Sequence, residues 1–398
     1  MARLSRLLIL SAAYGEGHQQ AARAVEAAVT TLCPEADVQI LDYLHDVHPR
    51  LDAMAKYFYL QSVKYAPTLY KWFYQSTSQL TPQSLIQRQL NSLGIETLAA
   101  TLHNFRPNIV LATFPTPAGV VSMLKQQGRT NIPLTTLITD HAIHSQWIHP
   151  QTDLYFAPSN YVREGLMERG TSPDRVEVTG IPVREAFCRP WNKAELRREL
   201  ELSEEKPILL LMGGAYGVLG DLGQVALQLA KYSNQLQLIV VAGKNERLYQ
   251  QLCGMPELAE AGVKIFGFVR DVYRLMAASD LMLTKAGGLT VSESMALGLP
   301  LIIYRPIPGQ EIQNCHYLTK AGTACLARNQ QEIVDISLRL LIDNPEEIRK
   351  MRQRALAIRH VNAAEVIAQR LIALANGRIV YPTPKFATMS ANSTGVVR

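Results

Sequence analysis

Leu283-Thr284-Lys285-Ala286-Gly287-Gly288-Leu289-Thr290-Val291-Ser292-Glu293 is the segment that says most about the architecture of the chain. It has the pattern of a buried strand, a two-glycine turn and the start of a helix. Such a turn presents free backbone N–H groups and the positive end of the helix dipole, which together favour a phosphate group. Glu293 follows within the helix, where its carboxylate can accept two hydrogen bonds from a ribose diol. We therefore predict a nucleotide-sugar site in an α/β domain.

A second polar turn, Pro308-Gly309-Gln310-Glu311, follows the next predicted strand. There, Gln310 and Glu311 are placed to hold sugar hydroxyls beside the glycine turn. Two alternatives for the first stretch require no ligand. Thr290-Val291-Ser292-Glu293 has the form of a capping box, in which the glutamate bonds back to the start of its own helix. Gly287-Gly288 can also be only a tight strand-to-helix turn.

Length and composition indicate two domains in a reducing compartment. The 398 residues exceed what one hydrophobic core usually holds. A net charge of +6 and a pI near 9.0 suit acidic partners, either nucleic acid or an anionic lipid surface. The five cysteines are scattered and lack C-x-x-C spacing, so we expect neither a disulfide framework nor a zinc site. No apolar run approaches the roughly 18 residues of a spanning helix, so a membrane would be met from one side.

Predicted strands and helices alternate along the chain, which is the pattern of parallel sheets covered on both faces. The first unit has strands at 6–11, 38–42, 109–114, 134–139, 154–157 and 176–180, with a mainly helical stretch at 46–105. The second unit has strands at 208–212, 236–242, 263–266, 281–284 and 301–304. The charged segment 184–207 lies between them, and we interpret it as a solvated helix at a domain boundary.

We therefore predict two facing doubly wound, Rossmann-like domains, at 1–185 and 186–360, with a cleft between the carboxyl ends of their sheets. A C-terminal helix is expected at 361–376. The tail 377–398 loses periodicity and collects proline and serine, so we expect it to be disordered. Because the glycine turn lies in the second domain, the first domain should hold the other substrate.

His18 is the candidate general base. It follows the first strand in Gly15-Glu16-Gly17-His18 and opens a helix, whose dipole disfavours the imidazolium form and keeps the ring neutral near pH 7. A neutral imidazole can take the proton of an attacking hydroxyl. The alternative is that His18 only caps or packs the turn. Asp140, just past another strand end, could orient His18 or take the proton itself.

The residues after Asp140 are candidates for an acceptor pocket. His144 and Trp147 could line it. A metal site is an alternative, because His141, His144 and His149 lie near an aspartate. The spacing of His141 and His144 is not a zincin pattern and no thiolate is near, so we expect no metal. A hydrogen-bonded turn is the other alternative.

An aromatic segment with interleaved lysines, residues 57–74, lies in the helical stretch of the first unit. Its rings include Tyr59, Trp72, Phe73 and Tyr74. Such rings beside lysines suit the boundary between acyl chains and headgroups of an anionic membrane surface. Packing between helices is the alternative. The basic residues form no sustained stripe, so we expect no nucleic-acid partner.

Taken together, these motifs resemble the glycolipid glycosyltransferases related to plant monogalactosyldiacylglycerol synthase, and especially the bacterial processive diacylglycerol glucosyltransferases. The similar stretches are 8–18, Thr139-Asp140 with His144, Trp147 and His149, 180–184, 217–219, 284–311 and the aromatic segment. The tail from about Gly377 does not match. The donor portion alone is also similar to the enzyme that adds N-acetylglucosamine to the lipid-linked peptidoglycan precursor.

The resemblance implies a GT-B fold and an inverting transfer of a hexose from a UDP-hexose to diacylglycerol, with glucose favoured and galactose possible. It implies no cofactor or metal, and a peripheral location on the cytoplasmic face of the cell membrane. A UDP-sugar epimerase and a non-catalytic nucleotide-sugar sensor on the same scaffold remain alternatives.

The resemblance also implies roles for individual residues. His18 would be the base, with Asp140 as its partner or replacement. In the donor site, Glu293 would bind the ribose, and Gly287 and Gly288 would bind the diphosphate. The backbone near Phe268 and Val269 would bind the uracil. Gln310 and Glu311 would bind the hexose, and Gly217 would also belong to the donor site. Ala286 departs from the pattern, because relatives often have proline there, which puts the rigidity of the turn in question.

Overall fold

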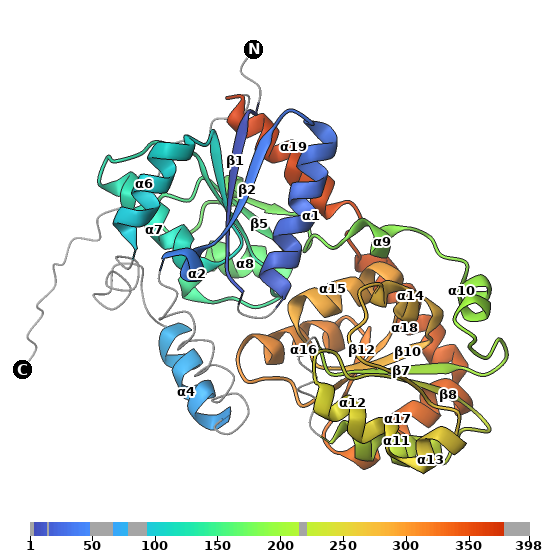
Figure 1. Ribbon diagram of the computed structural model, residues 1–398. Helices are drawn as coiled ribbons and strands as arrows, with labels where there is room; N and C mark the ends of the chain where they lie inside the picture. The colour runs from blue at the N-terminus through green and yellow to red at the C-terminus, as the bar shows by residue number, and fades with distance from the viewer. Residues whose placement is uncertain (1–3, 14–15, 48–66, 79–93, 215–220, 378–398) are drawn as a thin grey trace, which may run out of the picture.

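The chain forms two six-stranded parallel sheets with helices on both faces of each (Figure 1). This computed structural model describes residues 4–13, 16–47, 67–78, 94–214 and 221–377. The first sheet has the strand order β2-β1-β3-β4-β5-β6, and the second has the order β12-β11-β10-β7-β8-β9. The prediction of two doubly wound units is therefore confirmed. The predicted disordered tail lies outside the described residues, apart from Gly377.

The first sheet is built from the first half of the chain. Its strands are β1 (Arg6–Ser11), β2 (Asp37–Asp42), β3 (Ile109–Ala112), β4 (Leu134–Leu137), β5 (Leu154–Ala157) and β6 (Val176–Val178). The helices of this half are α1 (Gly17–Leu32), α2 (Tyr43–Val47), α4 (Pro67–Ser78), α6 (Ile95–Phe105), α7 (Pro115–Gln126), η1 (Ser145–Trp147), α8 (Asn160–Glu168) and η2 (Pro173–Arg175).

The second sheet follows the segment between the domains. Its strands are β7 (Ile208–Met212), β8 (Gln237–Val241), β9 (Lys264–Phe266), β10 (Leu281–Thr284), β11 (Leu301–Tyr304) and β12 (Ala324–Ala327). The helices are α9 (Glu185–Cys188), α10 (Lys193–Glu199), α11 (Leu222–Ala230), α12 (Glu246–Cys253), α13 (Pro256–Glu260), α14 (Val272–Ala278), α15 (Gly288–Leu297), α16 (Gln310–Lys320), α17 (Gln330–Leu338), η3 (Arg339–Asp343), α18 (Pro345–Ile358) and α19 (Ala363–Ala375).

Strand β12 is absent from the strands that the sequence predicts. Its sequence, Ala-Cys-Leu-Ala, has little of the β-branched and aromatic character that favours strands. It lies at the edge of the second sheet, paired with β11 alone among the described strands, and Leu326 is 44% exposed. In contrast, all five residues of the central strand β7 are buried, which gives the continuous apolar run typical of parallel sheets.

The strand orders fix where a ligand can bind. In the first sheet the order reverses between β1 and β3, and in the second between β7 and β10. Loops that leave such neighbouring strands in opposite directions open a crevice at their carboxyl ends. His18 follows β1 and Thr113 follows β3, whereas Gly214 follows β7 and Gly287 follows β10. All four therefore lie at the switch points of the sheets.

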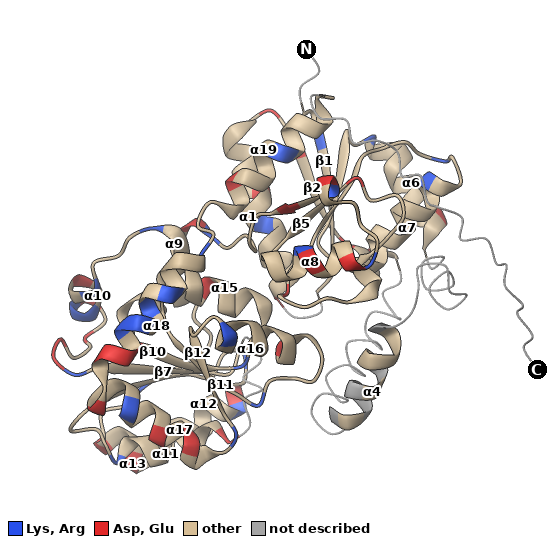
Figure 2. Cartoon of the chain, turned by 180° about the vertical axis from the view of Figure 1, so that it is seen from behind, with Lys and Arg blue, Asp and Glu red and all other residues tan. Residues whose placement is uncertain are grey.

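The last helix, α19, returns to the first sheet. It packs on α1, and Ile367, Ala368 and Leu371 join the hydrophobic core beneath β1 and β3. The chain therefore crosses between the domains twice, ahead of α9 and between α18 and α19 (Figure 2). The two crossings touch, because a Cβ added at Gly180 would lie 2.3 Å from the Cβ of His360.

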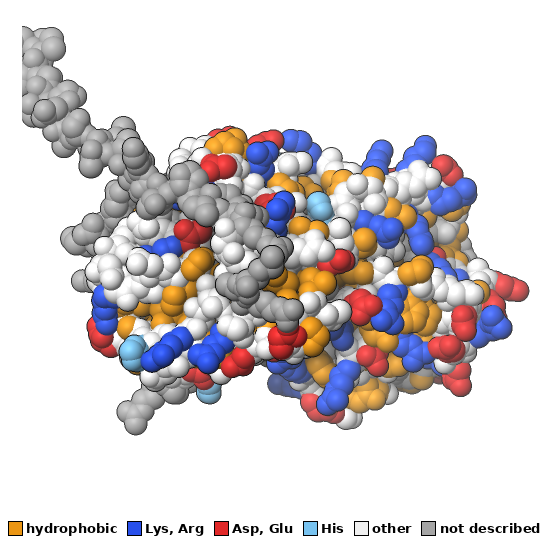
Figure 3. All heavy atoms as spheres, turned by 90° about the horizontal axis from the view of Figure 1, so that it is seen from above, with side chains coloured by type: hydrophobic (Ala, Val, Ile, Leu, Met, Phe, Trp, Pro, Cys, Tyr) orange, Lys and Arg blue, Asp and Glu red, His pale blue; other side chains and the backbone are white. Residues whose placement is uncertain are grey.

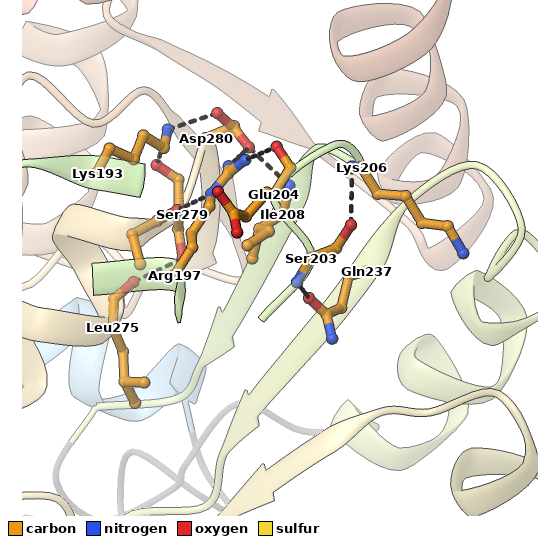
Figure 4. Close-up of polar contacts among 11 residues, drawn as sticks. Lys193, Arg197, Ser203, Glu204, Lys206, Ile208, Gln237, Leu275, Ser279 and Asp280 are labelled. Atoms are coloured by element: carbon orange, nitrogen blue, oxygen red, sulfur yellow. Dashed lines mark hydrogen bonds and ion pairs between the residues drawn. The ribbon is translucent and has the colours of Figure 1, made fainter. Parts of the chain in front are cut away.

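The charged segment between the domains is not simply solvated. Arg197 of α10 is only 8% exposed, and its Nη2 donates to Asp280 at 2.6 Å. The same carboxylate accepts a bond from Lys193 Nζ at 2.5 Å and one from the backbone N–H of Ile208 at 2.7 Å (Figure 4). The prediction of a solvated helix therefore holds for only one side of α10, where Glu195, Arg198 and Glu199 are exposed. On the other side, the buried Arg197 and the half-buried Lys193 hold the helix to Asp280 of the second domain.

Replacing Asp280 with alanine should lower the free energy of unfolding by roughly 2–4 kcal/mol, because Arg197 would be left buried without its carboxylate. Urea unfolding measures the change. Glu185→Ala, which breaks an exposed pair with Arg189, is the matched control and should change the stability much less, because water screens this pair. Equal losses in the two variants would contradict an anchoring role for Asp280.

The surface carries charges of both signs. Lys and Arg side chains are interspersed with Asp and Glu on the face that Figure 3 shows. Within the described part of the chain, we find no helix that combines the length and apolar character needed to cross a membrane.

Candidate active site

A cleft of about 1350 Å³ lies between the two domains. Helix α1 and the start of α19 form one side, and the loops after β7, β8 and β9 form the other, together with α15. The predicted uracil residues, Phe268 and Val269, and the predicted ribose ligand, Glu293, all line this cleft. Residues that are far apart in the sequence thus meet on one wall.

Glu293 is buried within α15, with 7% of its surface exposed. Helix α15 begins at Gly288 with Gly287 as its N-cap, so Thr290 and Glu293 both lie inside the helix. The capping-box alternative is therefore wrong. Burial raises the pKa of Glu293 to about 8, and the positive charge of Arg184 opposes that rise. A carboxyl group that water solvates poorly is suited to receive the hydroxyls of a ligand.

The opposite wall of the cleft is connected to this one by an ion pair. Glu16, at the start of α1, contacts Lys244 Nζ at 2.5 Å. The Glu16 side chain makes no capping hydrogen bond to its own helix, so its partner is the other domain. Lys244 also lies 5.4 Å from the ring centroid of Phe268, which is 55% exposed. The ring therefore offers a flat apolar surface near a positive charge.

His18 lies in the first turn of α1, next to Gly17, where a Cβ added at this glycine would lie 3.7 Å from Leu289 of α15. Its Nδ1 is 2.9 Å from Thr139 Oγ1, and its ring packs edge-on against Phe114 at 5.2 Å between centroids. Burial lowers the pKa of His18 to about 4, although a hydrogen bond to the backbone of Thr113 opposes the shift. The ring is thus neutral at pH 7, as a general base requires. Its partner is Thr139 and not Asp140, so the predicted pairing of His18 with Asp140 is not what the structure contains.

Asp140 instead reaches across to the second domain. Its carboxylate accepts hydrogen bonds from Asn314 Nδ2 at 2.9 Å and from the backbone N–H of Gly288. Burial raises the pKa of Asp140 to about 7, and Glu311 adds to the rise. A Cβ added at Gly288 would lie 2.1 Å from the carbonyl oxygen of Thr139. The carboxylate therefore occupies the helix N-terminus that we predicted for a diphosphate.

Glu311 holds the turn between β11 and α16. Its Oε2 accepts the N–H of Ile307 at 2.8 Å, and its Oε1 lies 3.3 Å from Lys285 Nζ. The same Oε1 would be 3.8 Å from a Cβ added at Gly287. Glu311 and the glycine turn are thus neighbours in the structure. Gln310 begins α16 beside them.

The predicted acceptor residues Tyr74 and His144 lie together. Their ring centroids are 4.7 Å apart, and His144 Nε2 lies 3.3 Å from Thr77 Oγ1. The Tyr74 ring fills the space where a Cβ of Gly309 would be, at 2.8 Å. Helix α4 therefore contacts the turn that precedes α16.

Other predicted residues lie elsewhere. Trp147 is buried in the core of the first domain, with its ring centroid 6.3 Å from that of His18, so it supports the His18 pocket and does not line an open surface. Trp72 on α4 is 65% exposed. Tyr59 and Gly217 lie outside the described residues, as does the side chain of Phe73.

Sequence reasoning missed Asn314 and Thr139 as members of the site. Asn314 lies four residues after Gln310, a spacing that puts both on one side of α16 and could have indicated it. Thr139 belongs to a stretch that resembles the family, but the sequence does not indicate its contact with His18, which depends on how two distant loops meet. Among the residues described, we find no group of three or more His, Cys, Asp or Glu side chains that could hold a metal ion.

Two facing parallel sheets with a cleft at their carboxyl ends define the GT-B class. Solved structures agree at the level of the fold. The structure of MurG from Acinetobacter baumannii superposes with a TM-score of 0.58 at 14% identity, covering 92% of this chain and 99% of that one. A putative UDP-N-acetylglucosamine 2-epimerase from Listeria monocytogenes gives a TM-score of 0.63 at 17% identity, covering 96% of this chain and 99% of that one.

Sequence comparison identifies the family, whereas the solved structures above show only the fold. Residues 18–183 match the monogalactosyldiacylglycerol (MGDG) synthase family, and residues 208–371 match the glycosyltransferase family 28 C-terminal domain. A processive diacylglycerol beta-glucosyltransferase from Bacillus cytotoxicus is 35% identical over 367 residues, which are 92% of this chain and 93% of the relative. One from Bacillus mycoides is 35% identical over 86% of this chain and 87% of its own length. The chain belongs to this family of diacylglycerol glucosyltransferases.

Proposed function

We propose that this protein transfers glucose from UDP-glucose to the free hydroxyl of diacylglycerol, with inversion at the anomeric carbon. The observation that carries the proposal is the 35% identity, over 92% of the chain, to an enzyme named for this reaction. The cleft supports it, since Glu293, Phe268 and Val269 line one wall, and helix α1, which carries His18 in its first turn, contacts α15 of the second domain. The relatives do not favour transfer of N-acetylglucosamine to a cell-wall precursor.

His18 is the proposed base. Its neutral ring takes the proton of the glycerol hydroxyl while that oxygen forms a bond to the anomeric carbon of glucose. The bond from this carbon to the diphosphate breaks, and UDP leaves with the bonding electrons on the face opposite the attack. The β product named for the relatives requires this inversion, because UDP-glucose is linked in the α configuration.

The N-terminus of α15 is the proposed site for the charge that develops on UDP. In the structure, the N–H of Gly288 already donates to Asp140. The donor diphosphate must therefore displace this carboxylate from Gly288 before it can use the same N–H. Lys285, held 3.3 Å from Glu311, lies next to the turn and adds a positive charge there.

A panel of donors tests the proposal. Vesicles containing diacylglycerol are incubated with the protein and either UDP-glucose, UDP-galactose or UDP-N-acetylglucosamine, and the extracted lipids are identified by mass spectrometry. We expect monoglucosyldiacylglycerol, followed by longer chains if transfer is processive. An epimerase would change the sugar of the nucleotide without lipid product, and a sensor would bind UDP-glucose without turnover. Either result would overturn the proposal.

We further propose that the protein works as a peripheral protein on the cytoplasmic face of an anionic membrane, with α4 as a contact. Trp72 of this helix is exposed, whereas Tyr74 and Thr77 hold the same helix against the turn before α16 and against His144. A ring that enters the headgroup region would thus lie on the helix that borders the acceptor side.

Replacing Trp72 with serine should weaken binding to anionic vesicles by roughly tenfold, because the burial of one large ring is lost. Flotation with vesicles measures the bound fraction. Tyr161→Ser removes another exposed aromatic ring of the first domain, on α8, and should leave binding unchanged. Unchanged flotation of the Trp72 variant would contradict the role of α4.

A further inference from the structure

Residues 139–143 of the first domain are docked on one helix of the second, α16. Asp140 accepts a hydrogen bond from Asn314, and the N–H of Ile143 donates to Gln313 Oε1 at 3.0 Å. Between these two contacts, the rings of His141 and Tyr317 stack at 4.2 Å between centroids with 7° between their planes. Three successive contacts thus join this segment to α16, and we call residues 139–143 the docking segment.

The stack of His141 on Tyr317 is a packing contact and not a hydrogen-bonded one. His141 is buried, and among the described residues neither of its ring nitrogens has a hydrogen-bond partner. Burial lowers the pKa of this imidazole to about 3, and the nearby His360 adds to the shift. The ring is therefore uncharged and acts as a flat surface, which a phenyl ring could replace without loss of a hydrogen bond.

Asn314 connects this contact to the donor turn. Its Nδ2 donates both to Asp140 and, at 2.8 Å, to the carbonyl oxygen of Ala286, immediately before Gly287. The side chain is completely buried, so bulk water does not compete for these two bonds. The docking segment, α16 and the start of α15 are therefore linked through one amide group.

The docking segment begins with Thr139, which together with the backbone of Thr113 orients the ring of the proposed base. Thr139 Oγ1 lies 2.9 Å from His18 Nδ1, and Thr139 is followed directly by Asp140 and His141. Any movement of the segment away from α16 would carry Thr139 with it. The direction of the His18 ring then depends on a contact made by the other domain.

We propose that the docking segment positions His18 for transfer only when it rests on α16, and that Tyr317 is a positioning residue for the reaction. Tyr317 acts through His141 and Thr139 and does not touch the reacting atoms. This inference rests on the proposed function, because it assigns the base of that reaction a partner that is set by domain closure. Misplacing a catalytic group by about 1 Å can cost on the order of a hundredfold in rate.

The test compares Tyr317→Ala with two conservative variants, Tyr317→Phe and His141→Phe, which both keep a flat ring in the stack. We expect Tyr317→Ala to lower kcat by about tenfold or more while the Kd for UDP is unchanged, since Tyr317 does not line the cleft that contains Glu293 and Phe268. Both phenylalanine variants should retain the wild-type kcat. His316→Ala, on the exposed side of α16, is the matched control and should have no effect.

A scattering measurement separates the docking role of Tyr317 from a failure of the proposed function, and a second substitution separates it from a general loss of stability. Small-angle scattering with UDP present should give a larger radius of gyration for Tyr317→Ala than for His316→Ala, whether or not any sugar is transferred. Tyr317→Leu keeps the bulk of the side chain, so it replaces the alanine variant if the melting temperature of the latter falls. Should wild-type protein form no glycolipid, the proposed function fails while the scattering comparison still decides the docking role.

The inference is overturned if Tyr317→Ala and its leucine counterpart keep the wild-type kcat and the wild-type scattering curve. It is equally overturned if either phenylalanine variant loses as much activity as Tyr317→Ala. In that case a hydroxyl or an imidazole nitrogen acts directly, and the stack is not what matters.

Discussion

Replacing His18 with alanine is expected to lower kcat for glycolipid formation by roughly 10²–10⁴-fold, the usual contribution of a positioned general base. Binding of UDP should be nearly unchanged, because the residues proposed to hold UDP, Glu293, Phe268 and Val269, belong to the second domain. Initial rates with UDP-glucose and diacylglycerol vesicles, together with calorimetric titration of UDP, measure both quantities.

The pH dependence of kcat is a second test of His18 as the base. The pKa of His18 is lowered to about 4, so the ring gains its proton, and loses its ability to act as a base, only as the pH falls toward that value. Wild-type kcat should therefore persist well below the ordinary imidazole pKa of about 6.5. His103→Ala, on α6 away from the cleft, is the control. Full transfer by His18→Ala would make the assignment of the base wrong.

Replacing Glu293 with alanine should weaken UDP binding by roughly 10–100-fold, the worth of hydrogen bonds to a charged group. Glu365→Ala, which removes another carboxylate that lines the same cleft from α19, should change the affinity much less. Calorimetric titration of UDP measures each Kd. Equal affinities for the wild type and Glu293→Ala would exclude Glu293 as the ribose ligand.

The burial of Glu293 determines the direction in which pH changes the affinity for UDP. The pKa of Glu293 is raised to about 8, so in the free protein the carboxyl is mostly protonated at pH 7. Ribose hydroxyls donate best to the ionised form, so UDP binding should release a proton and the affinity should rise as the pH increases through about 8. Glu293→Gln should bind UDP without this pH dependence. If Glu293→Gln retained this pH dependence, the proton released on UDP binding would come from another group.

Much of the fold could be predicted because it depends on local patterns. Continuous apolar runs identified β7, β10 and β11 with the bounds that the structure has. The prediction missed strand β12, because an edge strand made of alanine, cysteine and leucine has no such pattern. The prediction that the charged helix α10 is solvated was incomplete for another reason. Arg197 of this helix is buried by pairing with Asp280, a residue more than 80 positions away that local sequence does not indicate.

The candidate site could be predicted in parts but not in its connections. The strand order brings Phe268 and Glu293 into one cleft because both follow parallel strands of one sheet. The partner of His18 and the place of Asp140 could not be predicted, since both depend on how the first domain meets α15 and α16. Only the structure places the Asp140 carboxylate on the N–H of Gly288.

The anomeric configuration of the lipid product is the most direct test of the proposed reaction. The protein is incubated with UDP-glucose and vesicles of anionic phospholipid containing diacylglycerol, and the extracted glycolipid is characterised by proton NMR. We expect glucose joined to the glycerol hydroxyl by a β linkage, formed by wild-type protein and lost with His18→Ala. An α-linked product, or free glucose and UDP without any lipid-linked sugar, would contradict the proposed inverting transfer.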